Sequence, residues 1–146
     1  MANEMEWTYA NQVTLEDSGA SAASDAFVAA DDADLSSANH QNYPLADFVL
    51  MCAFGAAVGA NYVVNLYRRD LNIDSTNDAP APAATYKSCY VGSFVIPSGA
   101  SAADYYPLPD VPLTQECEFY IENATNQNLS AGWDLKCKPK TYIPGS

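Results

Sequence analysis

Acidic residues are the most abundant groups in this sequence that could do chemistry. The chain has 146 residues, with 18 Asp and Glu, 6 Lys and Arg, and 1 His. The segment Asp31–Asp34 could begin a cation site, or it could supply one of two carboxylates for glycoside hydrolysis, which must lie ~5–9.5 Å apart across a cleft. Because the spacing singles out no partner among the other acids, we interpret this segment as a solvated acidic loop.

A second acidic segment, Asp70–Asp78, resembles the beginning of an EF-hand calcium loop. Oxygen-bearing side chains stand at its first, third and fifth positions. An EF-hand also needs glycine at the sixth position and a bidentate glutamate at the twelfth, where this chain has Ser75 and Ala81. Because Asp and Asn side chains also stabilise turns through their own backbone, we predict a turn here and no metal.

The cysteines and the single histidine are not spaced like a zinc or catalytic site. None of the four cysteines belongs to a CxxC pair, and His40 lies in a polar stretch away from any nucleophile motif. The sequence also lacks the GxSxG, HExxH, P-loop and GxGxxG motifs. We therefore predict no catalytic residue, no metal and no cofactor. We expect Cys52, Cys89, Cys117 and Cys137 to be reduced thiols that behave as small hydrophobic side chains.

The charge distribution argues against a nucleic-acid partner. The formal net charge is -12, whereas a duplex-binding protein neutralises phosphates with Lys and Arg. Residues 1–67 contain no Lys or Arg at all. This acidic half would repel nucleic acid and could instead lie as a solvated face or dock on a basic protein surface.

The sequence offers no segment that we interpret as a targeting signal or a membrane span. The first residues lack a basic region followed by an apolar one. The longest apolar stretch, Phe48–Ala60, is much shorter than the ~20 residues of a membrane helix and contains two glycines. We expect a soluble protein made in a cytoplasm, with no membrane partner.

The period of the apolar residues predicts strands almost everywhere. Proline, glycine, asparagine and aspartate are concentrated between the strands, as is typical of an all-β sandwich or barrel. Helix is expected at most as a short turn near residues 34–38 or 55–60. The predicted strands are Asp47–Phe54, Asn61–Arg68, Tyr86–Ile96, Cys117–Glu122 and Trp133–Lys138.

The domain organisation predicted is a polar N-terminal arm over residues 1–25 and one β-sandwich domain over residues 26–146. Residues 16–25 are small and polar, residues 75–85 are proline-rich and should be extended, and residues 97–112 should be a loop. Tyr and Trp provide large amphipathic contact surfaces. Our candidate partner-binding residues are therefore Trp7 and Tyr9 in the arm, with Tyr105 and Tyr106 in the loop.

The last two predicted strands suggest a register. In an antiparallel hairpin centred on Gln127, the opposed pairs would be Cys117 with Cys137, Phe119 with Leu135, Ile121 with Trp133, and Glu118 with Lys136. A slip of one residue would oppose inward to outward side chains, so this register is strongly preferred. The opposed cysteines would lie within disulfide reach, although we do not expect them to be bonded.

Six runs of the sequence carry a resemblance to known proteins: Asn42–Leu50, Asn65–Asp74, Val91–Phe94, Cys117–Asn123, Gly132–Lys136 and Pro139–Tyr142. Together they resemble small virion structural proteins of tailed bacteriophages, most of all the head-decoration (cement) proteins. The resemblance implies a sandwich or jelly-roll-like fold without catalytic residues. It also implies a dimer or trimer that binds the major capsid protein on the outside of the head, after synthesis in the host cytoplasm.

Two other functions remain open from the sequence. The first is a carbohydrate-binding β-sandwich of a phage tail or fibre, in which Tyr105, Tyr106 and Trp133 would stack on sugar rings. The inward position predicted for Trp133 counts against it. The second is a hydrolase, which rests only on the abundance of carboxylates.

Overall fold

The protein is an all-β sandwich, as the sequence predicts. The computed structural model describes residues 5–36 and 43–144, and it has no helix in these ranges. Consequently, no helix in this part of the chain could cross a membrane. The strands described are β1 (Met5–Tyr9), β2 (Val13–Gly19), β3 (Phe27–Leu35), β4 (Leu45–Cys52), β5 (Tyr62–Asp70), β6 (Tyr90–Ile96), β7 (Asp104–Pro112), β8 (Cys117–Ala124) and β9 (Trp133–Pro144).

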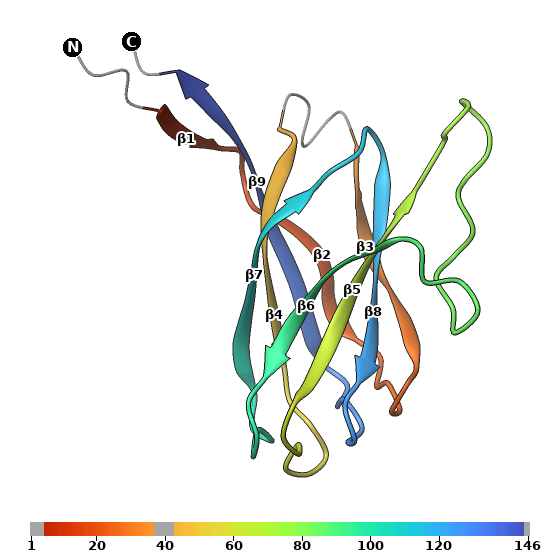
Figure 1. Ribbon diagram of the computed structural model, residues 1–146, viewed down its shortest axis with the longest axis vertical. Coiled ribbons are helices and arrows are strands. Elements are labelled where there is room, and N and C mark those ends of the chain that lie inside the picture. The colour runs from red at the N-terminus through yellow and green to blue at the C-terminus, as the bar shows by residue number, and fades with distance from the viewer. Residues whose placement is uncertain (1–4, 37–42, 145–146) are drawn as a thin grey trace.

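The strands form two antiparallel sheets that pack face to face (Figure 1). The first sheet has the order β1-β9-β4-β7, and β2 pairs with β9 on the same side as β1. The second sheet has the order β3-β8-β5-β6. The chain crosses to the other sheet at nearly every connection from β2 to β9, which is the eight-stranded jelly-roll arrangement. The predicted fold class is confirmed.

Alternating apolar residues on the facing strands fill the space between the sheets. On β9 the inward side chains are Trp133, Leu135 and Cys137, each at most 2% exposed. The rings of Phe48 and Phe119 meet across the core with their centroids 4.8 Å apart. Strand β4 alternates between buried and half-buried positions, so only one of its faces is in the core.

The predicted hairpin between the last two strands is wrong, although its inward faces are correct. Strand β8 pairs with β3 and β5, whereas β9 pairs with β1, β2 and β4 in the other sheet. Glu118 consequently forms its ion pair with Arg69, at 2.6 Å, and not with Lys136. In the jelly roll these two strands lie in opposite sheets, and each still alternates between inward and outward side chains. The alternation alone therefore does not distinguish a hairpin from two strands in facing sheets.

The four cysteines are free thiols. Cys117 and Cys137 point into the core from opposite sheets and are almost fully buried. Burial raises the pKa of the Cys137 thiol to about 12 and that of Cys117 to about 11. Because the thiolate is the reactive form, both groups are inert at neutral pH.

The predicted arm does not extend to residue 25, because β2 belongs to the first sheet. Leu15 is fully buried, and Gly19 packs so closely on Trp133 that a Cβ there would lie 2.1 Å from the indole Cε2. Two register shifts interrupt the pairing of β2 with β9. These bulges break the two-residue period, which is why the sequence pattern did not reveal this strand.

Two further local predictions are also corrected. The predicted loop at residues 97–112 contains β7, an edge strand whose prolines at positions 107, 109 and 112 suggested a loop. Proline is tolerated at a sheet edge because no ladder hydrogen bond is lost there. No helical turn forms at residues 55–60, and Asp34 and Leu35 end strand β3; residues 37 and 38 lie outside the described ranges.

Candidate functional site

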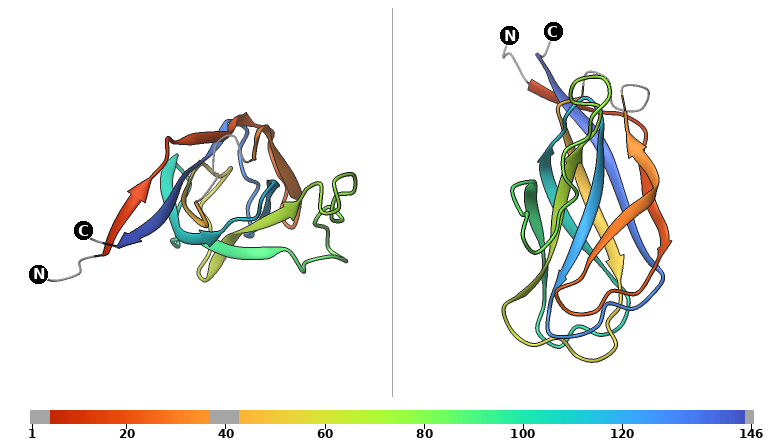
Figure 2. Two further views of the ribbon diagram at one scale, coloured as in Figure 1. Left: turned by 90° about the horizontal axis from the view of Figure 1, so that it is seen from above. Right: turned by 90° about the vertical axis from the view of Figure 1, so that its right-hand side faces the viewer.

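The most distinctive surface is a two-stranded extension at the chain ends, which we call the terminal ribbon. It consists of β1 and residues 140–144 of β9, paired from Met5 opposite Pro144 to Tyr9 opposite Lys140. Figure 1 and the left view of Figure 2 show it extending beyond the body of the sandwich. The ribbon therefore offers surface on which another molecule could bind without disturbing the core.

One face of the terminal ribbon, its ring face, carries a cluster of aromatic side chains. Opposed residues share a face of a sheet, so Trp7, Tyr9 and Tyr142 lie on the same side. The rings of Trp7 and Tyr142 stack with centroids 3.5 Å apart and an interplanar angle of 32°. Their exposed fractions are 36% for Trp7, 43% for Tyr9 and 47% for Tyr142. Half-exposed rings of this kind are the side chains most enriched in protein interfaces.

A buried lysine, Lys140, lies against the ring of Trp7 on the ring face. Lys140 is only 4% exposed, and its ammonium lies 4.1 Å from the centroid of the Trp7 ring. The ammonium also forms ion pairs with Asp47, at 2.7 Å, and with Asp110. Burial opposes the charged ammonium, but these two carboxylates outweigh it and raise the pKa of Lys140. The buried cation thus stays charged and fixes the position of the indole above it.

Tyr9 is tied to the first sheet at the base of the terminal ribbon. Its hydroxyl donates a 3.4 Å hydrogen bond to Asp47, and the ammonium of Lys138 lies 5.4 Å from the centroid of its ring. Burial would raise the pKa of Asp47, but the hydrogen bonds it accepts from Lys140 and its other neighbours lower it. The carboxylate therefore stays ionised, and it restrains Tyr9 directly through the hydrogen bond from its hydroxyl and Trp7 indirectly through Lys140.

The structure separates the four candidate partner-binding residues. Trp7 and Tyr9 lie together on the ring face, but Tyr106 is 5% exposed and belongs to the core. Tyr105 is 71% exposed and lies beside Met51, whose other neighbour is Asp134 near the start of β9. That position is eight residues, or ~26 Å, from Tyr142 along the strand.

The β9 half of the ring face is not among the residues predicted from the sequence. Tyr142 lies directly opposite Trp7 although 135 positions separate them in the chain. The alternation of Lys138, Lys140 and Tyr142 continues the pattern of the predicted strand 133–138. Extending that strand through Pro139 would have shown these side chains, but the proline suggested that the strand ended there.

A buried carboxylate organises the outer surface of the second sheet. Glu122 is 3% exposed and accepts hydrogen bonds from Tyr67, at 2.6 Å, Asn65, at 2.9 Å, and Lys87, at 2.8 Å. Burial alone would raise the pKa of Glu122, but these three donors lower it. The network fastens the loop that carries Lys87 onto β5 and β8, and this is a structural role.

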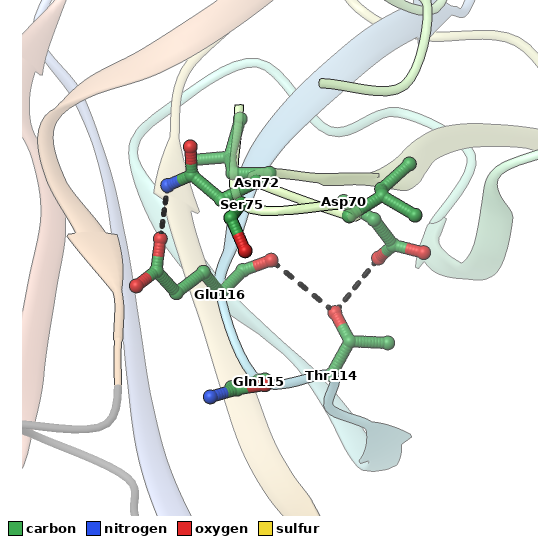
Figure 3. Close-up of a pocket in the computed structure, with 8 residues that line it drawn as sticks. Asp70, Asn72, Ser75, Thr114, Gln115 and Glu116 are labelled. Atoms are coloured by element: carbon green, nitrogen blue, oxygen red, sulfur yellow. Dashed lines mark hydrogen bonds between the residues drawn. The ribbon is translucent and has the colours of Figure 1, made fainter. Parts of the chain in front are cut away.

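The EF-hand-like segment forms a turn, as predicted. It borders a hollow of about 560 Å³ between the loops after β5 and before β8 (Figure 3). Thr114 donates to Asp70 at 2.7 Å, and Asn72 donates to Glu116 across this hollow. Asp74 instead accepts hydrogen bonds from its own turn, which lower its pKa to about 2. The three oxygen-bearing side chains therefore point to separate partners and do not converge on a common ion.

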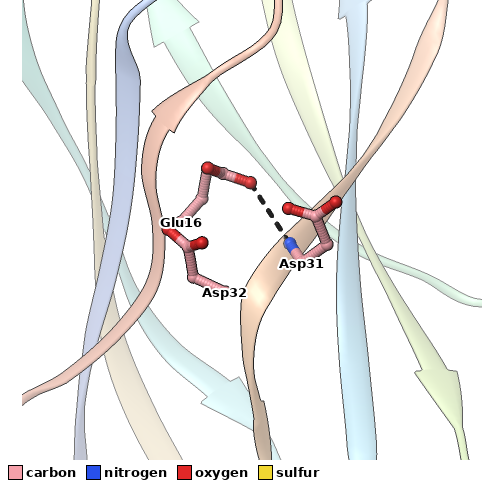
Figure 4. A group of neighbouring side chains, drawn as sticks. All are labelled: Glu16, Asp31 and Asp32. Carbon is pink, nitrogen blue, oxygen red and sulfur yellow. Dashed lines mark hydrogen bonds between the residues drawn. The ribbon is translucent and has the colours of Figure 1, made fainter.

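The predicted acidic loop at Asp31–Asp34 is part of strand β3, and β2 supplies the neighbouring carboxylate. Oxygen atoms of Glu16, Asp31 and Asp32 lie within 4.8 Å of one another, so these side chains could in principle hold a cation (Figure 4). Glu16 is 5% exposed and accepts a 3.2 Å hydrogen bond from the backbone amide of Asp31. Burial is the largest cause that raises the pKa of Glu16, and the neighbouring Asp31 and Asp32 raise it further. The arrangement is an acidic edge between the two sheets.

Substituting Glu16 by glutamine is expected to stabilise the protein. Because the folded pKa of Glu16 is raised, its charged form disfavours folding at neutral pH and this cost disappears as the pH falls through the folded pKa. We expect the free energy of unfolding at pH 7 to rise by about 0.5–1 kcal/mol, measured by urea denaturation. The gain should vanish in acid, and the exposed control Glu6→Gln should change nothing. A loss of stability at pH 7 would show that the buried charge of Glu16 does not oppose folding.

No protein-family model, no curated protein and no solved structure matches this chain. Its class is therefore defined by architecture: a jelly-roll β-sandwich with an aromatic terminal ribbon. His40 lies outside the described residues. In the acidic edge formed by Glu16, Asp31 and Asp32, the carboxylates of Glu16 and Asp32 accept hydrogen bonds from the backbone amides of Asp31 and Asp17.

Proposed function

We propose that this protein is a non-enzymatic structural component of a virus particle that decorates the outside of a bacteriophage head. The observation that carries the proposal is the terminal ribbon, whose half-exposed Trp7, Tyr9 and Tyr142 form a pre-organised contact surface away from the core. Stacking and the buried Lys140 restrain these rings. Little side-chain freedom is then lost on binding, and pre-organisation of this kind increases affinity.

Two observations support a capsid as the partner: the jelly-roll fold and the resemblance of the sequence runs. Jelly rolls recur in viral capsid and lectin domains, but the fold hosts unrelated functions and supports the proposal only by analogy. The resemblance of the sequence runs to head-decoration proteins supports it more directly. Many copies on a repeating lattice would also make a modest contact at each terminal ribbon sufficient for stable attachment.

The carbohydrate-binding alternative has little support from the arrangement of the aromatic residues. Of the three rings it required, Trp133 is fully buried and Tyr106 is 5% exposed. Only Tyr105 is available, and a single ring does not form a stacking platform. The hydrolase alternative rests only on the abundance of carboxylates. Three of the most engaged, those of Glu16, Glu116 and Glu122, accept hydrogen bonds that hold loops or strands together.

The first test is a count of copies by quantitative mass spectrometry in purified particles of the virus that encodes this chain. A decoration protein should be present in many copies, in a fixed ratio to the major capsid protein. A handful of copies would indicate a tail or neck component, and absence from the particle would overturn the proposal.

The double substitution Trp7→Ala with Tyr142→Ala should weaken binding to heads that lack this protein by at least tenfold. Removing central aromatic side chains from an interface commonly costs about 2 kcal/mol or more, and 1.4 kcal/mol corresponds to a factor of ten. Co-sedimentation with purified heads measures the affinity. Tyr105→Ala is the matched control, because it removes an exposed ring at the distant end of the sheet. If the control weakens binding and the double variant does not, the ring face is not the contact.

A further inference from the structure

Strand β1 has a free edge that is built to accept another strand. It lies at the end of the first sheet, so among the residues described no strand pairs with its far side. Its sequence, Met-Glu-Trp-Thr-Tyr, is rich in residues with high β-propensity and contains one charge. Such an edge presents unpaired N–H and C=O groups to any incoming strand.

The other edge strands carry features that discourage such pairing, and β1 lacks them. β7 holds three prolines and a register shift, and β2, β3 and β6 each pair with a shift that marks a bulge or irregularity. β1 pairs with β9 over five residues without any shift. Prolines and bulges protect sheet edges from pairing with other chains. Among the edge strands described, β1 is the one without either feature, and this favours pairing of its edge with another strand.

The backbone groups on this free edge can be assigned. The amide of Ala10 donates a 2.8 Å hydrogen bond to the carbonyl of Pro139, the next pair in the register of β1 with β9. Hydrogen-bonded and non-hydrogen-bonded pairs alternate in an antiparallel ladder. Thr8 and Glu6 therefore turn their backbone groups towards β9, whereas those of Met5, Trp7 and Tyr9 face outward.

We propose that β1 pairs with β1 of a second copy of this chain, antiparallel and about a two-fold axis centred on Trp7. In this register all three outward-facing residues find partners: Trp7 pairs with its own symmetry mate, and Met5 pairs with Tyr9. Glu6, the single charge of β1, lies opposite Thr8. A register centred on Glu6 would oppose two carboxylates, and one centred on Thr8 would pair fewer outward groups.

The electrostatics of the terminal ribbon permit contact between two copies of a chain with a net charge of -12. Glu6 is the only acid in β1, while the ammonium groups of Lys138 and Lys140 lie against the rings of Tyr9 and Trp7. Because Asp47 and Asp110 next to the ribbon are both ion-paired with Lys140, Glu6 is the main carboxylate that each copy brings to the contact, and it lies opposite Thr8. A two-fold contact of this kind is closed, since the same patch is used on both subunits.

This inference does not depend on the proposed function, because it concerns the edge of the terminal ribbon and not its ring face. Pairing about an axis perpendicular to the ribbon would place the ring faces of both copies on the same side. The resulting row of Tyr142, Trp7 and their symmetry mates would double the surface available to a partner. If the capsid proposal failed, the pairing could still be tested on the purified protein.

The test is a pair of cysteine variants, Glu6→Cys and Thr8→Cys, mixed under mild oxidation. In the proposed register these positions face each other with Cα atoms ~4.5 Å apart, within disulfide reach. In either variant alone the two cysteines would lie ~8 Å apart, which is too far. We expect the mixture to give a covalent dimer on non-reducing gels, with each single variant at the level of the parent chain. Equal cross-linking in all samples, or none in the mixture, would overturn the proposal.

A second pair of variants shows whether the backbone edge is responsible. Tyr9→Pro, introduced into both cysteine variants, removes an outward N–H while keeping the hydrogen bonds of β1 to β9, and it should abolish the cross-link. Tyr9→Ala removes the same ring but keeps the N–H, and it should retain the cross-link. Circular dichroism checks that both remain folded. A cross-link that survives Tyr9→Pro would exclude strand pairing as its cause.

Discussion

Replacing Trp133 by alanine is expected to remove about 3–5 kcal/mol from the free energy of unfolding, as large-to-small substitutions of buried aromatic residues do. Trp133 is fully buried, and Gly19 of β2 lies directly against its ring. Its indole nitrogen also donates a 2.8 Å hydrogen bond to the carbonyl of Ala20. The substitution would open a cavity between β2 and β9 and leave that carbonyl without its partner. Urea denaturation measures the loss.

Trp7 provides a matched control within the same chain, because the sequence has only two tryptophans. Trp7→Ala removes the same side chain from the surface and should cost ~1 kcal/mol, the contribution of an aromatic pair. Trp133→Phe should lose less than Trp133→Ala, since most of the ring volume is kept. If Trp133→Ala were no more destabilising than Trp7→Ala, the close packing of β2 against Trp133 of β9 described above would be contradicted.

Replacing Glu122 by alanine should cost about 2–4 kcal/mol, because it leaves one buried and one part-buried donor without an acceptor. The hydroxyl of Tyr67 and the amide of Asn65 both donate to Glu122, and Tyr67 is 1% exposed. Lys87 is half exposed, so its ion pair is screened by solvent and contributes less. Thermal and urea unfolding of the variant measure the effect, with the exposed Glu6→Ala as control.

The stability that Glu122 contributes is expected to depend on pH. The pKa of Glu122 is lowered in the folded state below its ordinary value of 4.5. Its stabilisation is therefore complete above pH ~4.5 and is lost as the pH falls through the folded pKa. Glu122→Gln should be less stable than the parent at pH 7, and the difference should narrow below pH 4.5. A difference that stayed constant down to pH 2 would show that the charge of Glu122 does not contribute.

The sequence could predict part of the candidate site and not the rest. Large amphipathic rings suit an interface, and that property, which points to Trp7 and Tyr9, belongs to the residues themselves. Tyr105 and Tyr106 are neighbours with the same chemistry, yet one is exposed and the other is in the core. Their exposure depends on which face of β7 packs inward, and that is decided by the strands around it.

What the sequence determined by itself is the all-β class and the inward faces of the central strands. A period of two is a local property of the chain, so Phe119 and Ile121 on β8, and Trp133 and Leu135 on β9, could be assigned to the core directly.

Only the tertiary structure decided which strands pair. The same alternation fits a hairpin and a crossing between two sheets, and the bulges of β2 and the prolines of β7 hide both strands from a periodicity argument. The stacking of Trp7 on Tyr142 and the burial of Lys140 beneath them join the two ends of the chain. Such contacts arise from strand pairing over long sequence separations, which no local pattern encodes.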